Sequence, residues 1–234
     1  MRGLLESGAA DPWGTLGTVL DGPLHPGGLE ATDRLLDRAG VESGVRLLDI
    51  GCGGGESLAL ARERGAEAVG LDSQPRTDRI VRGDMSRLPF AAESFGVALS
   101  ECVLCLSADH ERAFAEAARV LEPGGRLAVS DVVIDGEPPA VPAAMTEALC
   151  LGGHRDRTAV LGAIDAAGFG IETVRSHRED LLAMRDELAE KVAYERMLEL
   201  MGPTGTRALE GIEAVETAVE DGRLDYVSLV ARKR

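Results

Sequence analysis

The chain has 234 residues and a formal net charge of −15, and 44% of its residues are apolar while 3% are aromatic. This length allows one substantial core, and the acidic balance disfavours nucleic-acid partners, whose phosphate backbone requires a basic face. The chain starts without a long apolar segment and holds no run of the roughly 18 apolar residues that a membrane span needs. We therefore expect a cytoplasmic protein with a small-molecule substrate, no membrane partner, and free cysteines rather than disulfides.

The N-terminal stretch is rich in glycine and proline and ends in His25-Pro26-Gly27-Gly28. Residues 29–38 are amphipathic, which predicts a helix with Gly40 as its C-cap. The single tryptophan, Trp13, is either a packing anchor or part of a lid over a ligand. We expect residues 1–44 to form an N-terminal helical cap.

A glycine-rich loop follows the first predicted strand, residues 46–50. The loop reads Gly51-Cys52-Gly53-Gly54-Gly55 and leads into a predicted helix. Glycines allow positive φ and close approach of a ligand to the backbone, which predicts a nucleotide-type site. A dinucleotide fingerprint would need a small residue where Glu56 stands, so an NAD-linked enzyme is disfavoured. The G-x-G-x-G spacing behind Asp49 resembles motif I of class I S-adenosylmethionine (SAM) methyltransferases.

Two acidic residues follow the next predicted strands. The strand over residues 66–71 ends at Asp72, about twenty residues after the glycine loop, where Rossmann-type folds bind ribose hydroxyls. Only residues 73–78 separate Asp72 from a third strand, so we expect the usual crossover helix to be reduced or missing. Asp84 either caps a turn or, as the methyltransferase resemblance implies, holds the adenine amino group while Met85 packs on the ring.

The rest of the chain alternates between strand and helix patterns, which predicts a parallel, doubly wound sheet. Strands are expected over 95–100, 126–133, 171–175 and 224–231, and helices over 109–121, 142–150, 158–167, 180–201 and 206–220. We expect an α/β protein with the Rossmann-like class I methyltransferase fold, in which a mostly parallel seven-stranded sheet has an antiparallel edge strand and a helical cover. Residues 45–176 would form the SAM-binding core, and residues 177–234 the C-terminal helices and closing strand of the same domain.

Several runs between residues 100 and 153, including the turn Glu122-Pro123-Gly124-Gly125, resemble those of arsenite methyltransferases. Ser100-Glu101-Cys102-Val103-Leu104-Cys105-Leu106 is similar to that family's Ser-Asn-Cys-Val-Ile-Asn-Leu, Ser130-Asp131-Val132 to its Ser-Asp-Val, and Cys150-Leu151-Gly152-Gly153 to its Cys-x-Gly-Gly. The family's two cysteines in these runs bind trivalent arsenic, and they match Cys102 and Cys150. Its additional N-terminal cysteines have no match here, and Glu101 replaces an Asn.

The candidate site residues divide between cofactor and substrate. For SAM, with S-adenosylhomocysteine as product, the resemblance implies Asp49, Gly51, Gly53 and Gly55 for the methionine part, Asp72 for ribose, Asp84 and Met85 for adenine, and Ser100 nearby. Asp49 has an alternative role as an acid that stabilises the turn. For the substrate, Cys102 and Cys150 are the catalytic candidates, as ligands of a metalloid substrate rather than of a resident metal, and His154 is a candidate base.

The other two cysteines receive structural interpretations. Cys52 is expected to be a small buried hydrophobe. Cys102-x-x-Cys105 alone does not make a zinc site, because no second CxxC exists. On a strand-like backbone, residues three apart would also point to opposite faces.

Three functions remain open from the sequence. The first is SAM-dependent methyl transfer to a thiol-bound trivalent arsenical or related metalloid, since thiolates are soft ligands. Two thiols suffice for an already methylated arsenical, whereas inorganic arsenite stays in question. The second is methylation of an organic oxygen, nitrogen or carbon centre, with the cysteines merely packing. The third is a non-catalytic sensor of SAM or of a metalloid.

Overall fold

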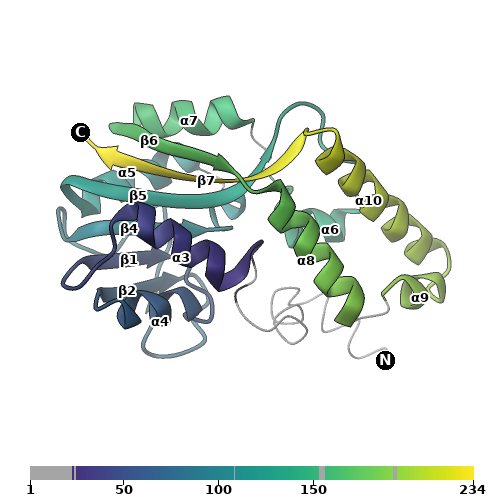
Figure 1. Ribbon diagram of the computed structural model, residues 1–234, viewed down its shortest axis with the longest axis horizontal. Coiled ribbons are helices and arrows are strands. Elements are labelled where there is room, and N and C mark those ends of the chain that lie inside the picture. Colours follow the sequence, from purple (N-terminus) through teal and green to yellow (C-terminus); the bar gives the residue numbers. More distant parts are fainter. Residues whose placement is uncertain (1–22, 24, 108, 153–155, 192–193) are drawn as a thin grey trace.

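A single sheet organises the computed structural model, which describes residues 23, 25–107, 109–152, 156–191 and 194–234. Its strands are β1 (Arg46–Ile50), β2 (Glu67–Asp72), β3 (Val81–Arg82), β4 (Phe95–Glu101), β5 (Leu121–Ile134), β6 (Phe169–Ser176) and β7 (Leu224–Lys233). Within the described residues they form a seven-stranded sheet in the order β3-β2-β1-β4-β5-β7-β6 (Figure 1). The expected α/β fold with a mostly parallel sheet is confirmed.

The C-terminal strand β7 is the antiparallel member of this sheet. It pairs antiparallel with β5 on one side and with β6 on the other. It therefore lies one place in from the edge, and β6 is the outermost strand at this end. Every residue from Leu224 to Ala231 is buried, as expected for a strand that is paired on both sides and covered on both faces.

Helices cover both faces of the sheet. On one face, α3 (Gly28–Ala39) and α4 (Glu56–Glu63) bury Leu36 and Leu58 against Leu47. On the other, α5 (His110–Val120) and α7 (Arg157–Ala166) bury Phe114 and Ile164 against Leu48. Adjacent strand residues thus face opposite layers, in keeping with the period of two of a strand. The result is a three-layer sandwich (Figure 1).

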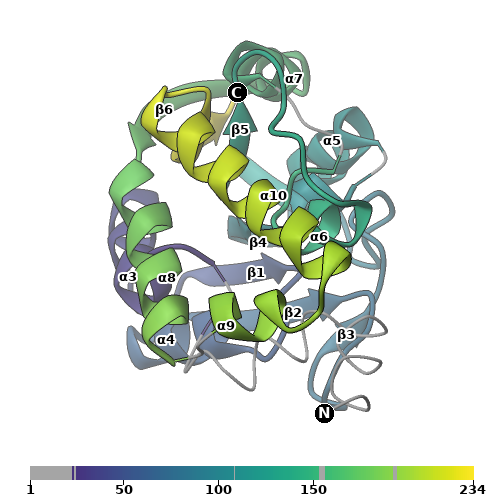
Figure 2. The ribbon, with the colours of Figure 1, turned by 90° about the vertical axis from the view of Figure 1, so that its right-hand side faces the viewer.

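The remaining helices lie toward the carboxyl ends of the parallel strands (Figures 1 and 2). They are α6 (Ala143–Ala148), α8 (Arg178–Lys191), α9 (Tyr194–Glu199) and α10 (Pro203–Glu220). The single helix expected over 180–201 is thus replaced by α8 and α9, on either side of residues 192–193, which lie outside the described part. Ala218 and Val219 of α10 pack against Ile134 at the end of β5 and so tie α10 to the sheet.

Between β2 and β3 the chain crosses over without a helix. The described residues 73–80 contain turns and bends only, and β3 has two residues, paired with Leu71 and Asp72. This confirms the expected loss of the crossover helix.

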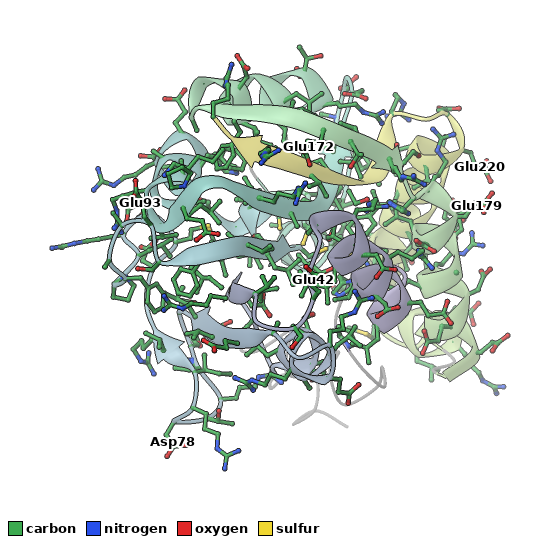
Figure 3. The ribbon with its side chains drawn as sticks, turned by 60° about the vertical axis from the view of Figure 1, so that its left-hand side comes forward. Glu42, Asp78, Glu93, Glu172, Glu179 and Glu220 are labelled. Atoms are coloured by element: carbon green, nitrogen blue, oxygen red, sulfur yellow. The ribbon has the colours of Figure 1, made fainter. Side chains whose placement is uncertain are left out.

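The surface is rich in acidic side chains, several of which are labelled at the periphery in Figure 3. Within the described ranges, no helix is both long and apolar enough to cross a membrane. Trp13 and His154 lie outside the described residues, as does most of the segment 1–27.

Candidate functional site

The loop between β1 and α4 requires glycine at three positions. Gly51, Gly53 and Gly55 have φ values of 78°, 51° and 91°, in the left-handed region that other residues adopt only at a cost. A Cβ on Gly51 would lie 2.4 Å from a methyl carbon of Val103, whereas a Cβ on Gly53 would have no atom within 4 Å. The N–H of Gly53 donates to Asp72 Oδ2 at 3.0 Å, so the end of β2 holds the loop.

The loop borders a large cavity at the carboxyl ends of β1, β2 and β4, where ligands bind in open α/β sheets. Its volume is about 1290 Å³. The expected cofactor residues in its lining are Asp49, Gly51, Gly53, Asp72, Asp84 and Met85. Gly55 and Ser100 are outside this lining: Gly55 is the N-cap of α4, and Ser100 is buried.

Asp49 is a buried carboxyl group that lines this cavity. Its side chain is 3% exposed, and its Oδ2 finds no hydrogen-bond partner among the described residues. Burial raises the pKa of Asp49 well above its usual value, and the nearby carboxylates of Glu101 and Asp72 raise it further. Such a site favours a cationic ligand, and SAM carries both an ammonium and a sulfonium group. The residues present therefore fit the expected cofactor.

Glu101 forms a buried polar network that sequence reasoning did not identify as functional. It accepts hydrogen bonds from Thr32 Oγ1 at 3.1 Å and from Ser57 Oγ at 3.0 Å. His25 Nε2 lies 3.6 Å from Glu101 Oε2, and both side chains are 5% exposed. Because His25 and Glu101 also line the cavity, they form an acid–base pair next to the ligand space. The contact spans most of the N-terminal half of the chain, so no local pattern signals it.

Asp84 caps a turn, one of the two roles left open from the sequence. Its Oδ1 accepts hydrogen bonds from the backbone N–H and the hydroxyl of Ser86, both at 2.8 Å. These hydrogen bonds lower the pKa of Asp84. Asp84 also lines the cavity, so the turn keeps its carboxylate charged there.

The cysteines that resemble arsenic ligands lie together next to this cavity. Ligand atoms of Cys102, Asp131 and Cys150 all lie within 4.8 Å of one another. Cys102 follows β4 and Cys150 follows α6, and their φ values are 52° and 55°. Non-glycine residues in this region are strained, and such strain is concentrated at functional sites. The two cysteines expected to converge are thus brought together.

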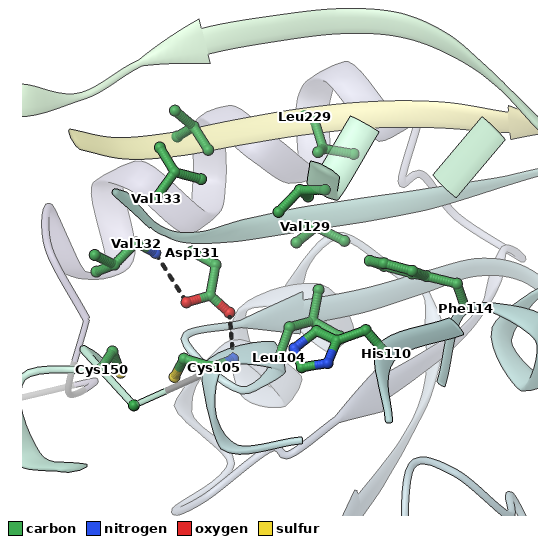
Figure 4. Close-up of a pocket in the computed structure, with 13 residues that line it drawn as sticks. Leu104, Cys105, His110, Phe114, Val129, Asp131, Val132, Val133, Cys150 and Leu229 are labelled. Atoms are coloured by element: carbon green, nitrogen blue, oxygen red, sulfur yellow. Dashed lines mark hydrogen bonds between the residues drawn. The ribbon is translucent and has the colours of Figure 1, made fainter. Parts of the chain in front are cut away.

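Asp131 organises the cluster from β5. Its Oδ2 accepts the backbone N–H of Cys105 at 3.1 Å, and its Oδ1 accepts the N–H of Val132 at 2.8 Å (Figure 4). Burial and the charge of Cys150 together raise the pKa of Asp131 to about 7.

Cys150 is hydrogen-bonded to the thiols of Cys102 and Cys105. Hydrogen bonds from Cys102 and from Cys105 lower the pKa of Cys150 to about 5. The same hydrogen bonds raise the pKa values of Cys102 and Cys105, which burial raises further. The hydrogen bonds of two neighbouring thiols therefore favour the thiolate form of Cys150. A thiolate is the form that binds soft metals and acts as a nucleophile.

The strand-like backbone expected between Cys102 and Cys105 is wrong. Leu104–Leu106 forms a 3-10 turn rather than a strand. This turn brings Cys105 Sγ to 3.6 Å from the carbonyl oxygen of Cys102, and Cys150 Sγ lies 3.9 Å from the same oxygen. Cys52, by contrast, is buried away from the cluster and packs in the core beneath α4, where burial raises its pKa to about 12.

Comparisons with known proteins agree with this geometry. Residues 48–129 match a family described as Methyltransferase domain. Methyltransferase GfsG of Streptomyces halstedii is 34% identical over 145 residues, covering 55% of this chain and 52% of that protein. The 27-O-demethylrifamycin SV methyltransferase of Amycolatopsis mediterranei is 30% identical over 240 residues, covering 87% and 84%.

Two further matches concern the substrate and the fold. Arsenite methyltransferase of Halobacterium salinarum is 34% identical over 113 residues, which cover 41% of this chain and 29% of that protein. This chain thus spans about half of the GfsG protein and under a third of the arsenite enzyme. The crystal structure of geranyl diphosphate C-methyltransferase from Streptomyces coelicolor, which contains S-adenosyl-L-homocysteine, superposes with a TM-score of 0.70 at 21% identity, covering 88% and 80%. That likeness shows the fold.

Proposed function

Because this chain belongs to the SAM-dependent methyltransferases, we propose that it methylates a trivalent arsenical, or a related soft metalloid, held by Cys102 and Cys150. The observation that carries the proposal is the cluster of Cys102, Cys150 and Asp131 within 4.8 Å, beside the cavity. Trivalent arsenic is a soft acceptor that prefers thiolates. Family membership also makes an enzyme the better reading than the non-catalytic sensor considered above.

SAM is the cofactor, and it supplies an electrophilic methyl group on a sulfonium sulfur. We propose that the loop Gly51–Gly55 and Asp49 hold its methionine part, and that Asp72 binds the ribose. Asp84 and Met85 would hold the adenine at the far end of the cavity. The acidic residues Asp49 and Glu101 place negative potential where the cofactor is cationic. In this arrangement the protein contributes mainly binding and orientation, which supply much of the rate in a displacement of this kind.

The cluster would orient the acceptor atom. Cys102 and Cys150 hold arsenic from one side, which leaves its lone pair free to face the cavity. A carbon–arsenic bond forms with that lone pair as the carbon–sulfur bond breaks, and the electron pair of the broken bond stays on sulfur, giving S-adenosylhomocysteine. Cys102 borders the cavity directly, whereas Cys150 lies behind it in a small pocket with Asp131.

The direct test uses purified protein, SAM, a reductant, and either arsenite or monomethylarsonous acid. We expect S-adenosylhomocysteine and a more methylated arsenical, detected by chromatography coupled to mass spectrometry. Cys102→Ser and Cys150→Ser are each expected to lower the rate by about 100-fold or more, because arsenic loses one of its bonds to the enzyme. Both variants should bind SAM as the wild type does. Full activity in both variants would exclude the metalloid role.

A second candidate, methylation of an organic hydroxyl, is favoured by the pair of His25 and Glu101. The pair lies in the cavity, and a histidine oriented by a carboxylate is suited to remove the proton of an acceptor hydroxyl. The relative from Amycolatopsis mediterranei is likewise named as the methyltransferase of a 27-O-demethyl compound. An arsenic lone pair, in contrast, needs no proton removed.

The variant His25→Asn separates the two candidates. If the substrate is a hydroxyl compound, His25→Asn should lower the rate of methylation by about 100-fold or more. Cys102→Ser should have no effect on that reaction. If the substrate is an arsenical, the pattern is reversed: Cys102→Ser abolishes turnover and His25→Asn retains most of it. A panel of small phenols and polyketide alcohols, assayed next to the arsenicals, supplies the comparison.

A further inference from the structure

A third cysteine, Cys105, lies beside the cluster and contacts Cys150. It belongs to the 3-10 turn Leu104–Leu106, at a position where the similar run of arsenite methyltransferases has an asparagine. Figure 4 shows Cys105 and Cys150 next to each other below the carboxylate of Asp131. Neither Cys105 nor its sulfur is needed for the two-thiol site proposed above.

Several contacts fix Cys105 at this place. Its backbone N–H donates to Asp131 Oδ2 at 3.1 Å, which anchors the turn to β5. Its Sγ lies 3.6 Å from the carbonyl oxygen of Cys102, and Cys150 Sγ lies 3.9 Å from that same oxygen. The sulfurs of Cys105 and Cys150 therefore both lie close to the carbonyl oxygen of Cys102.

The sulfur of Cys105 also faces the ligand space. Cys105 lines the large cavity together with Cys102, and it lines a small pocket together with Asp131 and Cys150. The small pocket has a volume of about 20 Å³, which exceeds the roughly 10–15 Å³ that one water molecule needs. A single ligand atom therefore fits beside Cys105 and Cys150 in the small pocket, and Cys105 also lines the large cavity together with Cys102.

We propose that Cys102, Cys105 and Cys150 together form a three-thiol site, which makes unmethylated trivalent arsenic, with three exchangeable ligands, the preferred substrate. The proposal rests on the metalloid function proposed above and deepens it. Arsenous acid reacts with three thiols to form three arsenic–sulfur bonds and release three waters, with no change of oxidation state. A monosubstituted arsenical has only two exchangeable ligands and leaves one thiol free. Cys105 therefore determines the preference between these substrates.

The test counts thiols and needs no turnover. Reduced protein is incubated with arsenite or with phenylarsine oxide, a probe that has two exchangeable positions, and free thiols are titrated with a chromogenic disulfide. We expect arsenite to protect three thiols and phenylarsine oxide two. X-ray absorption of the arsenite complex should then show three sulfur neighbours for arsenic.

Variants assign the third bond. Cys105→Ser and, independently, Cys105→Ala should weaken arsenite binding by about tenfold or more, because one of three linked bonds is lost, and should change the affinity for phenylarsine oxide by less than about threefold. Cys52→Ser is the matched control, since its sulfur lies in the core beneath α4. It should keep the protection of three thiols by arsenite. Circular dichroism verifies that each variant is folded.

The outcomes separate this proposal from the one on which it rests. If arsenite protects only two thiols, or if both Cys105 variants bind arsenite like the wild type, the three-thiol site is overturned while the two-thiol function stands. If neither arsenical protects any of the three cysteines, the metalloid function itself fails and the three-thiol site fails with it.

Discussion

The sulfur atoms of Cys102 and Cys150 lie within 4.8 Å of each other, although the two residues are 48 positions apart in the chain. Both residues adopt a positive φ, so the backbone is strained at each end of the contact. Strain at two distant positions that place two thiols together is difficult to explain by packing alone, since a serine or alanine would fill the same space. The relationship favours ligand binding as the reason for both cysteines.

The first prediction concerns the ionisation of Cys150. Its pKa is lowered to about 5 by hydrogen bonds from Cys102 and Cys105, so the thiolate should dominate above that pH. Alkylation of Cys150 by iodoacetamide should reach half of its limiting rate near pH 5, compared with about 8.5 for an ordinary thiol. Mass spectrometry of the peptide that contains Cys150 measures the rate at each pH.

A pair of variants at Cys102 tests the cause of this shift. Cys102→Ala removes the hydrogen bond that lowers the pKa of Cys150 most and should raise the midpoint by about one pH unit or more. Cys102→Ser keeps an O–H donor and should raise it less. A wild-type midpoint near that of an ordinary thiol would contradict the prediction.

The second prediction concerns the proposed ribose-binding role of Asp72. Asp72→Asn loses one negative oxygen next to the glycine loop and should raise the Kd of SAM by about tenfold or more, as expected when a charged hydrogen bond is lost. Asp78→Asn is the matched control, because Asp78 is an exposed acid of the same connection (Figure 3). Isothermal calorimetry with SAM compares them. Equal Kd values for the two variants would remove Asp72 from the site.

The third prediction concerns the packing of the glycine loop. A Cβ on Gly51 would lie 2.4 Å from Val103, and the residue has a φ of 78°. Gly51→Ala should lower the free energy of unfolding by about 2–4 kcal/mol, from backbone strain and overpacking together. Gly53→Ala introduces the backbone strain without a steric clash, and it should lower the free energy of unfolding by about 1 kcal/mol. Urea denaturation measures both, and Val103→Ala should rescue part of the loss in the Gly51 variant alone.

Local patterns were sufficient to predict most of the sheet and part of the site. The run of apolar residues before Gly51, and the acids Asp72 and Asp84 after later strands, are signals within short windows. They place side chains at the carboxyl ends of parallel strands, and these ends share one edge of the sheet. The convergence of Cys102 and Cys150 followed from the same rule.

The remaining features depend on contacts between distant residues. Thr32 and Glu101 are 69 positions apart, and nothing in either local sequence indicates their hydrogen bond. The place of Cys105 depends on a 3-10 turn of three residues, too short for a periodic pattern to reveal. The placement of β7 between β5 and β6 likewise depends on long-range strand pairing. The apolar run of β7 fits an internal strand and an edge strand equally well.

The last prediction concerns Asp49, whose buried Oδ2 finds no hydrogen-bond partner in the described part of the chain. If Asp49 binds a cationic ligand, its ionised carboxylate destabilises the ligand-free protein. Asp49→Asn should then be more stable without SAM by about 1–3 kcal/mol, which corresponds to a Tm higher by about 2–12 °C in a chain of this size. The same variant should show a smaller increase in Tm when SAM is added.

The pH dependence of this difference follows from the raised pKa of Asp49. The folded protein binds a proton at Asp49 more tightly than the unfolded chain, whose pKa is near 3.8, so ionisation destabilises the wild type as pH rises between the two values. The advantage of Asp49→Asn should therefore be largest at high pH and should shrink as the pH falls toward 4. Differential scanning fluorimetry across this range, with and without SAM, measures both effects. An Asn variant that is less stable without SAM, and gains as much from SAM as the wild type, would instead assign Asp49 to stabilising the turn.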